Sequence, residues 1–329
     1  MRKRTKIAGG LFLLFMSGIY LANASWLAPV PMGHPGVLAH RGVHQTFSPV
    51  GLTDRSCTAA RIDPPINPYL ENTIPSMGAS FAAGATIVEL DVQPTTDGDI
   101  AVFHDWGLDC RTDGRGVTRD QSMAELRALD VGYGYTADGG RTHPFRGKGV
   151  GLMPTLDEVM TAFPWRRFLI NIKSNDPSEA DRLVAYLVSH GRPTDERLWV
   201  FADGRPVDRL LKIAPRAIVM SKQRWKACAL GYLATGWAGR LPTACQQNVL
   251  PVPMNMRLLF WGWPNRLIAR ADAAGVPVML LGPVRGRSLG MSDPSQLEAV
   301  PSGFPGLIMT DEIELIGPAV HQRWREGRS

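Results

Sequence analysis

Internal repeats and low-complexity tracts are missing from this chain of 329 residues, which excludes a solenoid of repeated units. An excess of charge of one sign is also missing from most of it. The formal net charge is +6, but four basic residues lie within the first six positions, so about +2 remains for the body. So small an excess does not predict a nucleic-acid partner.

An apolar run long enough to cross a membrane occurs at one place, residues 7–24. It follows the basic segment and ends with small residues at positions 22 and 24, which is typical of a secretory signal peptide. Its 18 residues also reach the lower limit for a membrane-spanning helix. We therefore predict that residues 1–24 are a signal peptide or an uncleaved membrane anchor, and that the body is exported, either periplasmic or anchored at the inner membrane. A buried helix is the weaker alternative, because it would place four basic residues beside a core.

Short apolar runs alternate with longer amphipathic stretches along the rest of the chain, which is the pattern of strands and helices around a parallel sheet. Predicted strands are 37–40, 87–92, 100–104, 168–173, 198–202, 217–221, 249–252, 276–281 and 307–310. Predicted helices are 76–83, 123–129, 156–163, 178–189, 205–213, 225–234, 264–274 and 294–300.

The connection before strand 100–104 is too short for a parallel crossover, so this strand is expected to return along its neighbour. The other eight strands and the helices fit an α/β fold, a TIM-type (β/α)8 barrel with long loops at the catalytic face. An open doubly wound sheet is the alternative. We place a linker at 25–36, the barrel at 37–318 and a C-terminal tail at 319–329. The long segments 43–70 and 131–153 interrupt the rhythm and are candidates for lids or rims.

Cysteine is scarce, with four residues in the whole chain, and export would allow them to form disulfides. Cys57 and Cys110 follow candidate strands, so on a barrel both would lie at the same face, and a bond between them would tether the loops there. Cys228 and Cys245 are the natural remaining pair. Four cysteines allow three pairings, and four free thiols are the alternative.

Polar residues follow the apolar runs where strands end. Glu89 and Asp91 alternate along one strand, so their side chains point to the same side and can share one divalent cation, Mg²⁺ or Ca²⁺. His40 and His104 can accept and donate protons near neutral pH. Arg41 has a planar fork that suits two phosphate oxygens. Together these residues predict metal-assisted cleavage of a phosphate ester.

The spaced set His40-Arg41-Gly42, Glu71-Asn72-Thr73, Glu89-Leu90-Asp91 and His104-Asp105 resembles the glycerophosphodiester phosphodiesterase family, within the superfamily of phospholipase C-like phosphodiesterases. The resemblance implies a TIM barrel and a metal-dependent hydrolase. Such an enzyme cleaves a small-molecule or lipid-derived phosphodiester, glycerol-bearing in the first instance, to a phosphomonoester and an alcohol.

The resemblance also assigns expected roles, with one departure. Lys173 would add a second positive charge for the phosphate, and Glu71 would either orient Arg41 or contact the metal. The family has an acidic residue two positions before the lysine as the third metal ligand, and this chain has Asn171 instead. We expect the carbonyl oxygen of Asn171 to coordinate, with weaker metal affinity than an acid would give.

Two alternative functions are consistent with the same residues. One is a phospholipase D-like or lysophospholipase-type barrel enzyme that acts on a lipid head group, which a membrane-proximal start would favour. The other is a non-catalytic envelope binding protein derived from this fold, which the replacement at Asn171 alone favours.

Overall fold

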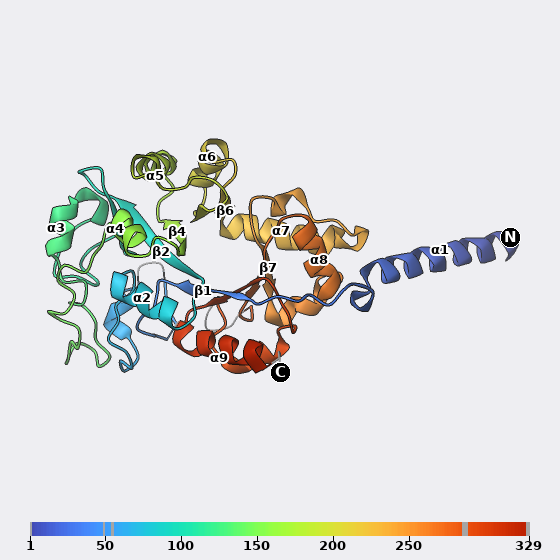
Figure 1. The fold of residues 1–329 in the computed structure, drawn as a ribbon, viewed down its shortest axis with the longest axis horizontal. Helices are drawn as coiled ribbons and strands as arrows, with labels where there is room; N and C mark the ends of the chain where they lie inside the picture. Colours follow the sequence, from blue (N-terminus) through green and yellow to red (C-terminus); the bar gives the residue numbers. More distant parts are fainter. Residues whose placement is uncertain (1, 49, 54–55, 285–288, 327–329) are drawn as a thin grey trace.

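The computed structural model describes the chain except residues 1, 49, 54–55, 285–288 and 327–329, and it describes only the backbone at 2–5 and 326. Within the described residues, eight parallel strands form a curled sheet in the order β6-β5-β4-β2-β1-β9-β8-β7 (Figure 1). Their bounds are β1 Gly36–His40, β2 Ile87–Pro94, β4 Arg167–Ile172, β5 Trp199–Phe201, β6 Ile218–Met220, β7 Leu250–Pro253, β8 Val278–Leu281 and β9 Leu307–Thr310. The short strand β3 (Ile100–Val102) returns antiparallel to β2, as the short connection predicted.

The curled sheet closes around an apolar interior. Between the two end strands, the backbone N–H of Val219 in β6 donates to the carbonyl of Gln247, just before β7, at 2.9 Å. Alternate side chains of the strands meet inside, where Leu38, Leu169 and Met279 belong to one buried cluster. The strand order, the parallel pairing and this shared interior confirm the predicted (β/α)8 barrel.

Helices cover the outside of the sheet and bury the other alternate set of strand side chains in the main core. They are α2 Ile74–Ala82, α3 Met123–Ala128, α4 Leu156–Ala162, α5 Ser178–Ser189, α6 Arg205–Ile213, α7 Lys222–Thr235, α8 Asn265–Ala273 and α9 Ile313–Glu326. Residues 294–300, predicted as a helix, form a 3₁₀ helix (Pro294–Ala299). Capping boxes begin α3 at Ser122 and α4 at Thr155, which explains why these short helices start where they do.

The predicted C-terminal tail is wrong for the residues that the structure describes. Helix α9 continues through Pro318 to Glu326, and Val320 and Trp324 on it are buried against the main core. Pro318 falls early in the helix, where one backbone hydrogen bond is lost but the buried face is kept. Residues 319–326 are therefore part of the barrel.

A second buried cluster lies over the end of the barrel where the strands finish. We call it the mouth cluster; it consists of Ala59, Ile62, Leu70, Ala101, Phe103, Leu108, Met123, Leu126, Val131, Tyr135, Phe145 and Met153. It joins both long segments, 43–70 and 131–153, to β3 and its following loop. A disulfide between Cys57 and Cys110 lies against this cluster, and a second joins Cys228 to Cys245. The described parts of the long segments thus form a packed rim at this end of the barrel.

Helix α1 (Arg2–Asn23) projects from the body, and its segment Lys6–Asn23 is long and apolar enough to cross a membrane (Figure 1). A 3₁₀ turn (Ser25–Leu27) and an extended stretch lead from it into β1.

Candidate active site

The ends of three neighbouring strands bring the predicted polar residues together. In the parallel register, His40 of β1 lies beside Glu89 of β2, and Asp91 lies beside Asn171 of β4. Side chains alternate along a strand, so His40 and Glu89 share the face of Leu38 and Ile87, which points into the barrel. The apolar interior residues thus fix the direction of the polar ones that follow them.

A sharp turn after β1 places Arg41. Its φ is +58°, and Gly42 follows with φ +82°. A Cβ at Gly42 would lie 2.1 Å from Oγ of Ser76 in α2, so only glycine fits there. Backbone hydrogen bonds from Arg41 N–H to the Glu89 carbonyl (3.0 Å) and from Asn72 N–H to the Arg41 carbonyl (3.0 Å) hold the turn.

The segment Glu71-Asn72-Thr73 supports this turn with three separate contacts. Glu71 Oε1 accepts from Nη1 of Arg41 at 3.1 Å. The Asn72 amide donates to Oδ2 of Asp91 at 2.9 Å, and its oxygen accepts the Asp91 N–H at 3.0 Å. Thr73 is the N-cap of α2. Asn72 is therefore a clamp on Asp91.

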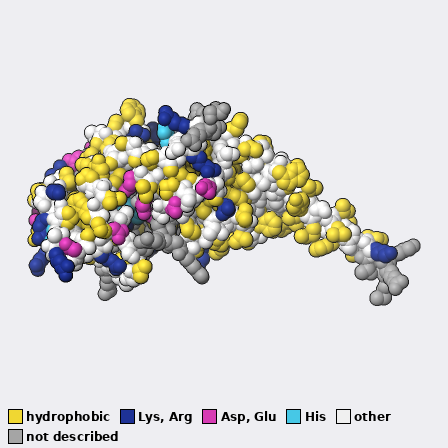
Figure 2. Space-filling model, turned by 90° about the horizontal axis from the view of Figure 1, so that it is seen from below, with side chains coloured by type: hydrophobic (Ala, Val, Ile, Leu, Met, Phe, Trp, Pro, Cys, Tyr) yellow, Lys and Arg dark blue, Asp and Glu magenta, His cyan; other side chains and the backbone are white. Residues whose placement is uncertain are grey.

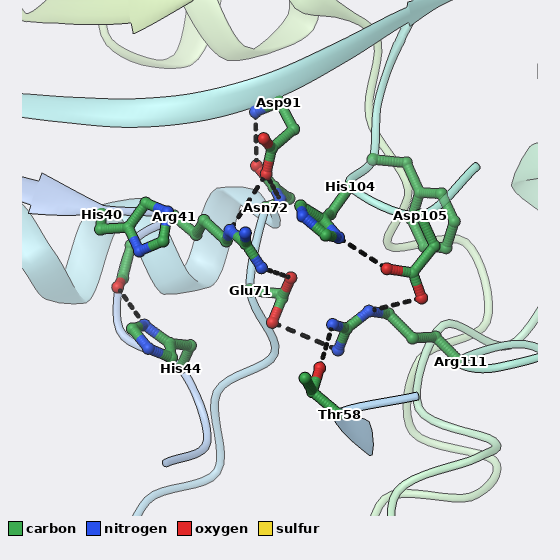
Figure 3. Close-up of polar contacts among 12 residues, drawn as sticks. His40, Arg41, His44, Thr58, Glu71, Asn72, Asp91, His104, Asp105 and Arg111 are labelled. Atoms are coloured by element: carbon green, nitrogen blue, oxygen red, sulfur yellow. Dashed lines mark hydrogen bonds and ion pairs between the residues drawn. The ribbon is translucent and has the colours of Figure 1, made fainter. Parts of the chain in front are cut away.

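Each of the two histidines is held by a carboxylate. Nδ1 of His40 lies 2.5 Å from Oδ1 of Asp311, and Nδ1 of His104 lies 2.6 Å from Oδ1 of Asp105. Each carboxylate fixes its ring and leaves Nε2 as the nitrogen for proton exchange. Figure 3 shows the two rings on opposite sides of Arg41.

The surroundings of the two rings shift their pKa values in opposite directions. Burial and Arg41 lower the pKa of His40, but Glu89 and Asp311 outweigh them and raise it above its usual range. Burial and Arg41 also lower the pKa of His104, and there Asp91 and Asp105 offset only part of the effect. The two rings are thus inequivalent although each is held by a carboxylate.

Arg111 is a buried residue of this site that sequence reasoning missed. Its Nη1 lies 3.2 Å from Oε2 of Glu71, and its Nε lies 2.9 Å from Oδ2 of Asp105. It also donates to the hydroxyls of Tyr135 and Thr58, each at 2.7 Å. Figure 3 shows Glu71 between the guanidinium groups of Arg41 and Arg111. The position of Arg111 beside Cys110 was the one signal, since the loop that carries it is tied to residue 57.

Glu89, Asp91 and Asn171 are the group that could hold a metal ion. The Asn171 amide nitrogen donates to Glu89 Oε1 at 2.9 Å and to Asp91 Oδ1 at 3.0 Å, so it stands between the two carboxylates. Asp91 is also 3.3 Å from Nε of Arg41 and 3.2 Å from Nζ of Lys173, and these cations lower its pKa despite burial.

Glu89 is less well compensated than Asp91. Burial and the charge of Asp91 raise its pKa above the usual range, although His40 and Arg41 lie close to it. A buried carboxylate pair with one member short of positive charge fits a hard cation. The oxygen and nitrogen of an amide are exchanged by a rotation that leaves the rest of the side chain in place, so Asn171 can present its oxygen to such an ion.

Some other groups lie away from these residues. In the segment 131–153, Arg146 stacks on Tyr133 with 3.9 Å between the guanidinium carbon and the ring centroid, so it serves the rim of the barrel. A cavity of about 600 Å³ is lined by Gly36, Ile87 and Leu307, at the end of the barrel where the strands begin. It is therefore at the opposite end from the histidines.

Comparisons with known proteins agree with this geometry. Residues 40–230 match the model of the glycerophosphoryl diester phosphodiesterase family. The glycerophosphodiester phosphodiesterase of Bacillus subtilis (strain 168) is 36% identical over 126 residues, which cover 36% of this chain and 42% of the relative. That of Caldanaerobacter subterraneus is 36% identical over 103 residues, covering 31% and 39%. The chain thus spans about two fifths of the length of these curated relatives.

Solved structures share the fold over nearly their whole length. A glycerophosphodiester phosphodiesterase from Agrobacterium tumefaciens superposes with a TM-score of 0.56 at 21% identity, covering 88% of this chain and 99% of the other. An Oleispira antarctica phosphodiesterase, solved in complex with the product sn-glycerol-3-phosphate, superposes with a TM-score of 0.52 at 19% identity, covering 88% and 97%. At these identities the likeness establishes the barrel. With the family match over residues 40–230, it follows that this chain belongs to the glycerophosphoryl diester phosphodiesterase family.

Proposed function

We propose that this chain hydrolyses glycerophosphodiesters, the deacylated forms of phospholipids, to a glycerol phosphate and an alcohol. The observation that carries the proposal is the pair of carboxylate-held rings, His40 with Asp311 and His104 with Asp105, on opposite sides of Arg41 (Figure 3). One ring would take the proton of the attacking hydroxyl and the other would supply the proton of the departing alkoxide.

Arg41 and Lys173 would hold the phosphate. Glu71 and Asp91 fix two edges of the Arg41 guanidinium, so its plane is set before substrate arrives. Lys173 Nζ is anchored on Asp91, and its side chain stays partly exposed. Both cations would offset charge that develops on the phosphoryl oxygens.

Glu89, Asp91 and Asn171 would bind one divalent ion, Mg²⁺ or Ca²⁺, through their oxygens. When bound, such an ion would supply Lewis acidity to a phosphoryl oxygen. The support is the buried carboxylate pair and the raised pKa of Glu89. We also propose an exported location for the barrel, for which the support is the apolar helix α1 after a basic start.

The direct test is release of choline or ethanolamine, together with glycerol phosphate, from glycerophosphocholine and glycerophosphoethanolamine. The purified chain should release both products, and a chelator should abolish the release until Mg²⁺ or Ca²⁺ is restored. The variants His40→Ala and His104→Ala should each lose about 10²- to 10⁴-fold in kcat. His143→Ala, in the rim segment, is the matched control and should keep full activity. Turnover that persists in both site variants would rule out the proposed roles of the histidines.

A further inference from the structure

Most of the surface of helix α1 has no cover within the described part of the molecule. No residue of its apolar segment Lys6–Asn23 is buried. Figure 2 shows hydrophobic side chains along the projecting helix and on the adjoining end of the body. Eighteen helical residues extend about 27 Å, close to the thickness of a bilayer core. An exposed apolar helix of this length fits the interior of a lipid bilayer.

The last turn of α1 is bound to the barrel by specific polar contacts. Arg270 of α8 donates from Nη2 to the Ala22 carbonyl at 2.8 Å and from Nη1 to Oδ1 of Asn23 at 2.9 Å. The Asn23 amide donates to the Trp237 carbonyl at 2.9 Å. An arginine at a helix C-terminus satisfies carbonyls that have no partner within the helix. These contacts join the helix to α8 and to the turn after α7.

The residues after α1 continue this attachment. Ala24 and Ala28 are buried, and the hydroxyl of Ser25 accepts the backbone N–H of Asn265 at 2.9 Å. The small residues that would form a signal peptidase site, Ala22 and Ala24, are thus the residues that dock on the barrel. In a folded chain with this geometry, the apolar helix is therefore attached to the barrel rather than a separate leader.

The attachment lies at the end of the barrel opposite the histidines. Helix α7 begins after β6 and must return the chain to the start of β7, so Trp237, which follows α7, lies where the strands begin. The catalytic groups lie where the strands finish. Figure 1 agrees, because α1 leaves the body on the side opposite α3 and the long loops of the mouth.

Two tryptophans mark the boundary between helix and body. The ring of Trp237 lies 6.4 Å, centroid to centroid, from Phe15 of α1. Phe15 stands eight residues before Asn23, about 12 Å along the helix. Trp26 follows α1 and is 67% exposed. Tryptophan is favoured where lipid meets water.

We propose that α1 is a retained bilayer anchor, docked through Asn23 and Arg270, which holds the catalytic mouth away from the membrane. The lipid–water boundary lies at Trp26, and the ring of Trp237 extends from this boundary along α1 to Phe15. Substrates then reach the mouth from the aqueous side, so the substrate class is water-soluble, deacylated phosphodiesters and excludes intact lipids of the membrane that carries the anchor. This last part rests on the proposed function; the anchor and its orientation do not.

Retention is tested by the intact mass of the full chain extracted from membranes. The expected mass includes residues 1–24. A mass that begins at Ser25, or full-length chain that remains soluble as an oligomer with α1 shielded by a second copy, overturns the anchor.

Orientation is tested in vesicles of phosphatidylcholine and phosphatidylglycerol with brominated acyl chains, which quench tryptophan near the bilayer. The double variant Trp26→Phe, Trp237→Phe should lose most of the quenching. Trp106→Phe, at the mouth, is the matched control and should leave the quenching unchanged. Equal quenching in all three proteins, or loss in the Trp106 variant alone, overturns the orientation.

Docking is tested by chymotrypsin cleavage after Trp26 and Leu27 in the reconstituted protein. Asn23→Ala removes the contacts of the Asn23 side chain with Arg270 and Trp237 and leaves the barrel residues unchanged. It should speed cleavage about tenfold or more, since the lost charge-assisted hydrogen bond with Arg270 contributes roughly 1.5 kcal/mol or more. Arg266→Gln, one turn from Arg270 on α8, is the control and should cleave at the rate of the parent. Equal rates in Asn23→Ala and the parent overturn the docking.

The substrate class is tested by comparing glycerophosphocholine in solution with phosphatidylcholine in the same vesicles. The anchored protein should hydrolyse the first and leave the second intact. Hydrolysis of the bilayer lipid at a similar rate overturns the inferred substrate class. If the protein hydrolyses neither substrate, the proposed function is wrong. The mass, quenching and cleavage results still show whether α1 is an anchor.

Discussion

Arg111 and Glu71 lie 3.2 Å apart, from Nη1 to Oε2, and this buried pair connects the two halves of the active site. Glu71 also binds Arg41, and Arg111 also binds Asp105, which in turn holds His104. The position of the proposed phosphate-binding arginine and the tilt of one of the two proposed catalytic rings thus depend on the same guanidinium group.

Replacing Arg111 should therefore impair catalysis without removing a group that touches substrate. We expect Arg111→Gln to lower kcat about 10- to 100-fold, the range for groups that orient catalytic residues. Arg115→Gln, an exposed arginine of the same loop, is the control. The readout specific to positioning is the pH profile of kcat, in which the limb due to His104 should shift in the Arg111 variant. An unchanged profile with normal kcat would contradict this role.

The two disulfides should differ in what they protect. Removing either one, as Cys57→Ala with Cys110→Ala or Cys228→Ala with Cys245→Ala, should lower the melting temperature. The bonds close loops with sequence separations of 53 and 17 residues, which corresponds to about 4 and about 3 kcal/mol in the chain-entropy account. Only the first pair flanks Thr58 and Arg111, so only its removal should also lower kcat below the melting range. Equal kcat in both double variants would refute this difference.

Asn171→Asp should destabilise the metal-free protein and increase its affinity for a divalent metal ion. The substitution removes the amide that donates to Glu89 and Asp91 and adds a third negative charge beside these two buried carboxylates. In chelator the melting temperature should fall, because like charges then face one another in a buried site. Titration calorimetry should show tighter binding of Mg²⁺ or Ca²⁺ than in the parent. No gain in affinity would place residue 171 outside the ligand set.

The lowered pKa of Glu71 predicts how the free energy of unfolding depends on pH. Burial alone would raise its pKa, but Arg111 and Arg41 lower it from 4.5 to about 2 in the folded chain. A carboxyl whose folded pKa is depressed stabilises fully above its unfolded pKa and loses this contribution as the pH falls toward the folded value. Urea denaturation should therefore show up to about 3 kcal/mol of lost stability between pH 5 and pH 2. Glu71→Gln should remove this part of the slope, and an unaltered slope would contradict the assignment.

The sequence predicted the barrel because its strands are apolar runs that alternate with amphipathic helices. Few architectures other than a barrel accommodate short parallel strands connected in this way. It placed His40, Glu89, Asp91 and Asn171 together because their strands end at one face. It could not place Arg111, whose partners come from three loops and whose loop has no periodic pattern. It also took residues 319–329 for a tail, and only packing against the barrel shows that α9 continues to Glu326.

The contact between His40 and Asp311 joins residues 271 positions apart, from the first and the last strand of the barrel. A ribosome must therefore synthesise almost the entire polypeptide before this ring acquires its carboxylate. Fragments that stop short of β9 would carry every motif of the first 105 residues and still lack an oriented His40. For a chain threaded across a membrane from its N-terminus, competence for catalysis would arise only when translocation is nearly complete.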